Sequence, residues 1–501
     1  MKRLVVALVA VLLLASCASG GHKSSSAAAG GSGLVAGSGS GSSSSSGAGA
    51  LAGLTSSGAS GTSTTGASGR AGATGSGGEI ALTPQVVATG GGVAEAESAA
   101  PPPVPAKNGN VTVGWFIVDT GTACSQYGVK CQGAADRPYV QALVNWANAH
   151  GGLGGYHINP VYYEVNVTDG DFTTQAAAAC AALSQDDHAF VSQGAWVDAS
   201  PQFANCSAQD HMIDIDGSEY PFADSNYSSL GPYLYQAARL RPERWVPSYV
   251  NDLIGRGFLT PSTKIGLLRL DIPAYTQLDS SVVKPLLASH GMSLTTDIEI
   301  SDLNGTDDIG AESSQLSSAV LRMKSAGVTR VLFLDASGEI TYFFGEEAQA
   351  EGYHPEYGVS STEGPEDMVN DGLGDQLTNA DGVSWLPGND VVASDDPGGA
   401  GAKLCEDITN AAGLNGGTGR DIYCDTMFFL RAVMASHPAL TPAAFQQAAD
   451  AVGSSALTSS TYTTYFAPGI QDGPSTYRDT AFQASCQCFK YADASSYQFP
   501  T

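Results

Sequence analysis

Residues 145–165 read NWANAHGGLGGYHINPVYYEV, where an amphipathic segment ends at two glycines and a β-branched and aromatic run follows. We expect a helix over residues 137–150 that ends at Gly151 and Gly152, because glycine readily adopts the left-handed conformation that closes many helices. The flanking runs, VTVGWFIV at 111–118 and residues 161–167, have the composition of strands. A strand, a helix and a second strand in this order predict a parallel sheet covered by helices.

The same alternation continues along the chain. Further strands are expected at residues 189–192, 212–215, 264–270 and 328–334. Further helices are expected at residues 173–183, 243–256, 280–289, 316–326 and 340–350. This part of the chain holds roughly 390 residues, which is more than one hydrophobic core usually supports. The fold class predicted is therefore α/β, with two lobes whose parallel sheets carry helices on both faces.

The start of the chain, residues 1–16, has the pattern of a bacterial lipoprotein signal peptide. Lys2 and Arg3 precede the apolar run 4–14, which is too short to span a bilayer but has the length of a signal-peptide core. Leu14-Ala15-Ser16-Cys17 then resembles a lipobox. We expect a lipid on Cys17 and an extracytoplasmic protein anchored to the cell membrane. The alternative is an ordinary secretory signal with an incidental cysteine.

Residues 17–109 consist mainly of Gly, Ser, Ala and Thr. Such a segment cannot bury enough apolar surface to offset its conformational entropy, so it is expected to be a disordered tether. A flexible chain of this length has a mean reach of about 50–60 Å.

The chain is strongly acidic, with 49 Asp and Glu against 22 Lys and Arg and a formal net charge of −27. A protein that binds nucleic acid needs cations to neutralise phosphates, so this balance argues against nucleic acid as a partner. It argues equally against a face that lies on anionic lipid.

Eight cysteines follow Cys17, and an even number in an exported chain indicates disulfides. Proximity along the sequence suggests four pairs, although the sequence leaves the connectivity open. The suggested pairs are Cys124–Cys131, Cys180–Cys206, Cys405–Cys424 and Cys486–Cys488. A metal site is not expected, since none of the 8 histidines lies at ligand spacing from a cysteine pair.

Three stretches resemble a known family. The first contains Asp119-Thr120-Gly121, NWANAHGGLGGYHI and VYYEV; the second, in residues 321–362, contains MKSAGVTRVLFLDASGE and AEGYHPEYGVSST. The third covers residues 466–491, with FAPG and Cys-Gln-Cys-Phe. Together they are similar to the type I periplasmic solute-binding proteins, in particular the branched-chain amino-acid-binding proteins of ABC transporters.

The resemblance implies two doubly wound parallel-sheet lobes joined by a three-strand hinge. By this reading residues 110–236 and 356–445 form lobe one, and residues 237–355 form lobe two. Residues 446–501 are a hinge crossing and a C-terminal return to lobe two. A ligand would bind between the lobes and close them.

The resemblance also implies ligand contacts in loops at strand ends of both lobes. The matching positions are Gln193, Trp196, Asp216, Tyr275, Asp335 and Glu363. The loop with Trp196 reads GAWVDAS, whereas amino-acid binders usually place small hydroxyl side chains there. This departure argues against an amino-acid ligand.

The function expected is capture of a small polar solute, such as an amino acid or a similar molecule, and its delivery to an ABC permease. The alternative is a sensory module of the same fold that presents its ligand-bound state to a membrane partner. No catalytic residues, cofactor or metal are expected, because no P-loop, dinucleotide fingerprint or zinc-protease motif is present in the sequence.

Overall fold

The computed structural model describes residues 108–118, 136–165, 170–194, 200–305, 307–414 and 421–501, which fold around two β-sheets. The strands of the first sheet are parallel and lie in the order β2-β1-β3-β4-β5. Their bounds are Asn110–Val118 (β1), His157–Val165 (β2), Val191–Gly194 (β3), Ile213–Asp216 (β4) and Leu234–Tyr235 (β5). The connecting helices are Asp136–Ala149 (α3), Phe172–Ala181 (α4), Gln202–Gln209 (α5) and Asp224–Leu230 (α6).

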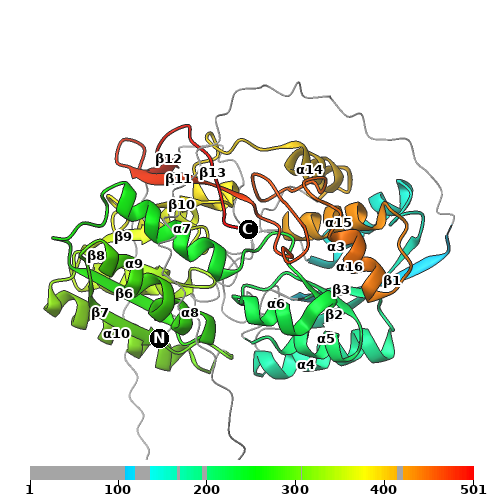
Figure 1. Cartoon of the computed structure of the whole chain (residues 1–501), viewed down its shortest axis with the longest axis horizontal. Helices are drawn as coiled ribbons and strands as arrows, with labels where there is room; N and C mark the ends of the chain where they lie inside the picture. The colour runs from blue at the N-terminus through cyan, green and yellow to red at the C-terminus, as the bar shows by residue number, and fades with distance from the viewer. Residues whose placement is uncertain (1–107, 119–135, 166–169, 195–199, 306, 415–420) are drawn as a thin grey trace, which may run out of the picture. The chain divides into compact units, whose positions relative to one another are not determined.

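Side chains of β1 alternate between the two faces of this sheet, as the pleat requires. Val113, Trp115 and Ile117 pack into a core with α3, whereas Phe116 packs on the opposite face with Phe203 of α5. Figure 1 shows α4 and α5 on one side of the sheet and α3 on the other, with two later helices. Both faces are therefore covered, which explains why β1 is apolar from Val113 onward.

The second sheet runs in the order β12-β11-β10-β9-β8-β6-β7. Its strands are Ile265–Leu270 (β6), Leu294–Ile300 (β7), Arg330–Leu334 (β8), Glu356–Val359 (β9), Asp381–Ser384 (β10), Thr476–Gln483 (β11) and Cys488–Tyr491 (β12), with Tyr497–Gln498 (β13) paired to β11. The helices around it are Pro242–Gly255 (α7), Pro273–Leu278 (α8), Lys284–Ser289 (α9), Ile309–Ala326 (α10), Glu339–Ala350 (α11), Pro365–Met368 (α12) and Pro387–Asp390 (α13). Strands β11 and β12 are antiparallel, so the sheet is mixed.

Both sheets share one winding order. The parallel strands of the second sheet read β7-β6-β8-β9-β10, which repeats the pattern β2-β1-β3-β4-β5 of the first. In such doubly wound sheets the helices change side next to the first strand, and ligands bind at the carboxyl ends of the strands there. The residues that follow β4 in the first lobe and β6, β8, β9 and β10 in the second are thus the positions to inspect.

The chain crosses between the lobes three times, at residues 236–241, 391–399 and 450–475. After the second crossing come Ala400–Ala411 (α14), Asp421–Met434 (α15) and Pro442–Ala449 (α16), whose described side chains pack against α3 in the core of the first lobe. Gln236 of the first crossing and Asp472 of the third pair as a parallel bridge. The crossing segments are therefore hydrogen-bonded to each other.

The boundary between the lobes differs from the one expected. We assigned residues 356–445 to lobe one, but β9 pairs in parallel with β8, and β10 pairs with β9, so the chain stays in the second sheet as far as Ser384. A short buried strand has the same sequence pattern whether it extends a sheet or crosses to another one. Its partner strand is decided by packing that the local pattern does not contain.

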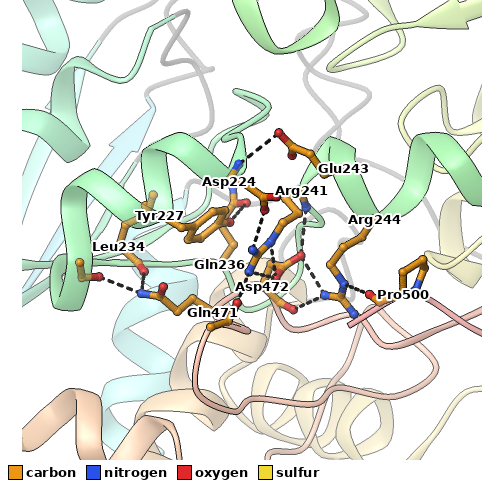
Figure 2. Close-up of polar contacts among 12 residues, drawn as sticks. Asp224, Tyr227, Leu234, Gln236, Arg241, Glu243, Arg244, Gln471, Asp472 and Pro500 are labelled. Atoms are coloured by element: carbon orange, nitrogen blue, oxygen red, sulfur yellow. Dashed lines mark hydrogen bonds and ion pairs between the residues drawn. The ribbon is translucent and has the colours of Figure 1, made fainter. Parts of the chain in front are cut away.

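A buried group of charges lies at the crossings (Figure 2), and we call Arg241, Arg244 and Asp472 the hinge clasp. Asp472 has no exposed surface, and its Oδ1 accepts from Nε and Nη2 of Arg241 at 2.9 and 2.7 Å. Its Oδ2 accepts from Nη1 of Arg244 at 2.8 Å, and Nε of Arg244 donates to the carbonyl of Pro500. The clasp joins the first crossing to the third and to the chain end.

A second contact between the lobes lies at the strand ends. The carbonyl of Asn304, in the loop after β7, accepts from the backbone N–H of Phe172 at 2.9 Å. Oδ1 of Asn304 accepts from the backbone N–H of Thr173 at 3.1 Å and from its hydroxyl at 2.8 Å. The first turn of α4 is thereby bonded across to the other lobe, and we call this contact the latch.

The structure contains the disulfides Cys180–Cys206, Cys405–Cys424 and Cys486–Cys488, three of the four pairs that sequence proximity suggests. Cys17, Cys124 and Cys131 lie outside the described residues. Among the helices described, none combines the length and the apolar character needed to cross a membrane.

Candidate ligand-binding cleft

Two adjoining cavities lie where strand ends of the second sheet meet residues from the first lobe and the first crossing. Their volumes are about 60 and about 20 Å³. Both are lined by Glu219, Arg239, Ser361, Thr362 and Leu386. Because these shared residues follow β4, β5, β9 and β10, the cavities occupy the edge at which doubly wound sheets bind ligands. We call the pair the cleft.

One end of the cleft is the smaller cavity, which we call the aromatic cavity. Trp245, Tyr275 and Trp385 line it, with Tyr220 contributed by the first lobe. The ring centroids of Trp245 lie 6.4 Å from those of Tyr275 and 5.8 Å from those of Trp385, and all three side chains are buried. Such packed rings offer a rigid apolar surface.

The other end is the larger cavity, which we call the acidic cavity. It is lined by Glu363, Asp367 and Asp371 together with Tyr342 and the shared residues. Oε2 of Glu363 accepts from the backbone N–H of Ser360, and Oε1 accepts from the hydroxyl of Thr362 at 2.7 Å. Among the described residues, no hydrogen bond to the carboxyl group of Asp371 is present.

Burial raises the pKa of each of these three carboxyl groups. The pKa of Glu363 rises to about 8, mainly through desolvation and further through the charge of Asp335. Desolvation raises the pKa of Asp371 to about 7. Desolvation and the neighbouring Asp371 hold the pKa of Asp367 well above its usual range. Each group therefore resists carrying its negative charge in the unliganded cavity.

The backbone around Glu363 approaches another loop very closely. Gly338 has φ +81°, and a Cβ at this position would lie 2.7 Å from the carbonyl oxygen of Glu363. Only glycine accommodates both this conformation and this contact without strain. The loops that follow β8 and β9 are thus fixed against each other beside the acidic cavity.

A single ion pair separates the two ends of the cleft. Nη2 of Arg239, in the first crossing, lies 3.0 Å from Oε1 of Glu219, which follows β4 in the first lobe. Burial raises the pKa of Glu219, while the guanidinium of Arg239 acts in the opposite direction. Arg239 is therefore paired with Glu219 through Nη2, while its Nε is buried without a partner among the described residues.

The six residues expected to contact a ligand do not all line the cleft. Tyr275 lines the aromatic cavity, from α8 rather than from a loop, and Glu363 lines the acidic cavity. Gln193, Asp216 and Asp335 line neither cavity, although all are buried. Trp196 lies outside the described residues.

Asp335 has the role of a helix cap. Its Oδ1 accepts from the backbone N–H groups of Ala336 and Ser337, and its Oδ2 accepts from the backbone N–H and hydroxyl of Thr341 at 3.0 and 2.8 Å. All of its acceptor capacity is thus used by the turn that begins α11. Its backbone carbonyl still supports the cleft, because it accepts from the hydroxyl of Tyr275 at 2.5 Å.

Asp216 and Gln193 lie at the carboxyl ends of β4 and β3. Oδ1 of Asp216 accepts from the backbone N–H and hydroxyl of Ser218 and from Nε2 of Gln236. Burial raises the pKa of Asp216 to about 6, against these hydrogen bonds. Among the described residues Oε1 of Gln193 has no partner. Asp216 therefore orders the loop that carries Glu219 rather than facing the cavities.

More carboxyl groups are buried behind the acidic cavity than the sequence led us to expect. Asp302, Glu312 and Glu339 lie close enough to Asp335 for its charge to raise the pKa of each of them. Burial is the largest cause for each, and it raises the pKa of Asp302 to about 7 and that of Glu312 to about 8. The lobe that forms most of the cleft is thus strongly acidic inside.

Four charged residues of the cleft were missed at the sequence level: Glu219, Arg239, Asp367 and Asp371. Glu219 and Arg239 come from a different lobe and a crossing, so their position depends on how the lobes meet. A signal was present for the others, since Glu363, Asp367 and Asp371 recur every four residues and can share a helical face.

Similar solved structures exist, although no family model and no curated protein matches this chain. A solute-binding protein of an ABC transporter from R. palustris, in complex with 4-hydroxybenzoate, is 14% identical with a TM-score of 0.56, over 78% of this chain and 98% of that one. The chain has the type I periplasmic-binding-protein fold.

Amino-acid complexes with this fold are similar to the chain as well. The substrate-binding protein from Desulfitobacterium hafniense in complex with Leu is 10% identical, with a TM-score of 0.53 over 76% of this chain and 99% of that one. The branched-chain amino acid transporter protein LivJ from Streptococcus pneumoniae, in complex with isoleucine, is 14% identical, with a TM-score of 0.52 over 78% and 100%. In this type I fold the cleft described above lies between the lobes.

Proposed function

We propose that the protein is an extracytoplasmic, lipid-anchored solute-binding protein that captures a small solute in the cleft, delivers it to an ABC permease and catalyses no reaction. The observation that carries this proposal is the pair of cavities at the strand ends of the second sheet, closed by Glu219 and Arg239 from the other side. Proteins of similar fold are titled as solute-binding proteins of ABC transporters, which supports this role.

Capture requires the lobes to move. Ligand pockets commonly have volumes of about 300–1,000 Å³, whereas the cavities hold about 60 and about 20 Å³. The cleft is therefore closed as described, and a solute enters when the lobes rotate about the three crossings. Breaking the latch is part of this movement, because its hydrogen bonds join the two lobes.

The test is to identify what the full-length protein carries and to block the cleft. Mass spectrometry of small molecules released on denaturation should reveal a copurifying solute, and calorimetry should then give its affinity. Thr362 lines both cavities, so Thr362→Trp should abolish binding while the protein remains folded. The matched control is Thr378→Trp, an exposed site outside the cleft, which should bind as the parent does. Full binding by the Thr362→Trp variant would refute the cleft as the solute site.

Lipid anchoring is tested separately. Cys17→Ser should release the protein from the membrane fraction, because it removes the thiol that would carry the lipid. Ser16→Ala keeps a small residue before the cysteine and should leave the protein in the membrane. A Cys17→Ser variant that stays in the membrane fraction after a high-salt wash would show that the anchor lies elsewhere.

A further inference from the structure

The acidic cavity has an unbalanced charge. Four carboxyl groups line it, and among its described lining residues Arg239 is the only cation. That guanidinium already bonds to Glu219 at 3.0 Å. Three carboxyl groups therefore line one small cavity without a cation of their own: Glu363, which is buried, and Asp367 and Asp371, which are half-buried.

Enclosure makes this imbalance costly. A carboxylate that leaves water needs compensating hydrogen bonds or an opposite charge, and otherwise takes up a proton. Glu363 has two hydrogen-bond donors, but Asp371 has none among the described residues. The field inside the cavity thus favours a positive group and opposes a negative one.

The two ends of the cleft suit different parts of a ligand. The aromatic cavity has packed rings for an apolar or aromatic body, and the acidic cavity has carboxylates for an ammonium or guanidinium group. An ammonium group is close in size to a water molecule, and a cavity holds a water when about 10–15 Å³ is open to the centre of that molecule. The acidic cavity, at about 60 Å³, has room for such a group.

We propose that the solute is a small organic cation, an amine whose positive group lies among Glu363, Asp367 and Asp371 and whose body extends toward Tyr275 and Trp385. This inference rests on the proposed function, since it names the solute class of the same cleft. A benzoate would place its carboxylate in an unfavourable field at the acidic end. A zwitterionic amino acid would bring a carboxylate, together with its ammonium group, into the same field.

The experiment uses four probes with the full-length protein in detergent. Tyramine and putrescine represent amines with and without a ring, and leucine and 4-hydroxybenzoate represent a zwitterion and an anion. We expect calorimetric binding and a raised melting temperature with tyramine or putrescine, and weaker or no effects with leucine and 4-hydroxybenzoate. Asp367→Asn and Asp371→Asn should each weaken amine binding about 30-fold or more, because each removes a desolvated partner of the charge. Asp375→Asn, an exposed acid on the same segment, should leave the affinity unchanged.

Each other outcome overturns the inference. Failure of both amines to bind at millimolar concentrations would exclude the amine class, as would amine binding that Asp367→Asn and Asp371→Asn leave unaltered. Stabilisation by calcium alone, lost in Asp367→Asn, would identify a metal site instead. If leucine or 4-hydroxybenzoate binds tightly and Thr362→Trp abolishes that binding, the inference fails while the proposed function stands.

Discussion

The hinge clasp and the acidic cavity both hold charged side chains that are buried or half-buried, but only the clasp pairs them with opposite charges. Asp472 forms ion pairs with two arginines. The only cation among the described residues that line the cavity of Glu363, Asp367 and Asp371 is Arg239, and it is paired with Glu219. A buried charge that serves stability is normally paired, since an unpaired one destabilises the fold. The contrast indicates that the clasp holds the crossings together and that the acidic cavity is adapted to something that binds there.

Removing the acid of the clasp should have the largest effect on stability. Asp472→Ala leaves the buried guanidinium of Arg244 without its carboxylate, so the free energy of unfolding should fall by about 3–5 kcal/mol. Urea denaturation followed by circular dichroism measures this loss. A loss below about 1 kcal/mol would mean that the clasp is no stronger than a surface ion pair and would break the comparison.

Neutralising an acid of the cavity should stabilise the protein in a pH-dependent way. The pKa of Glu363 is about 8 in the fold, against about 4.3 in an unfolded chain. The folded protein therefore holds the proton of Glu363 more tightly than the unfolded chain does. This stabilises the fold below a pH of about 4.3, and the contribution is lost as the pH rises to about 8. Glu363→Gln cannot ionise, so its stability relative to the parent should rise with pH across this window, by at most about 1.4 kcal/mol per pH unit.

Denaturation at pH 5, 6, 7 and 8 measures this difference for Glu363→Gln. The exposed Glu406→Gln on α14 is the matched control, and its curve should run parallel to that of the parent. A Glu363→Gln curve parallel to the parent's would mean that Glu363 ionises as easily in the cavity as in water.

Breaking an exposed ion pair on α14 should have the smallest effect on the free energy of unfolding. Nζ of Lys403 lies 3.1 Å from Oδ2 of Asp407 one turn later, and 75% and 60% of the two side chains are exposed. Solvent screens such a pair, so Asp407→Ala should change the free energy of unfolding by about 0.5 kcal/mol or less. A larger loss in the same urea assay would show that exposure does not separate the two kinds of charge in this protein.

The sequence predicted much of the fold because local patterns carry it. The strand at 111–118, the helix ended by Gly151 and Gly152 and the strand that follows are all present in the structure, with bounds within a few residues. What the patterns lack is strand pairing. Strands β9 and β10 extend the second sheet, and β11 and β12 add antiparallel edges, because their partners are far away in the chain.

The cleft was predicted less completely than the fold. Tyr275 and Glu363 line the cavities, and each was named because it follows a strand, a rule that places residues near the ligand edge. The rule does not say which way a side chain points. Asp335 and Asp216 were expected to face the ligand, but their carboxyl groups are buried and accept hydrogen bonds from Thr341 and Ser218. Glu219 and Arg239 enter the cleft only through the approach of the two lobes, which single-segment patterns cannot describe.

The latch between Asn304 and α4 also has a consequence for timing. Its three hydrogen bonds contribute about 0.5–1.5 kcal/mol each, so we expect the ligand-free protein to be open for only a small fraction of the time. When only a fraction of the molecules is open and able to bind, the apparent affinity for the solute falls in proportion to that fraction. Opening then limits the rate of association at high solute concentration. It limits dissociation as well, so Asn304→Ala should shorten the residence time of a bound solute.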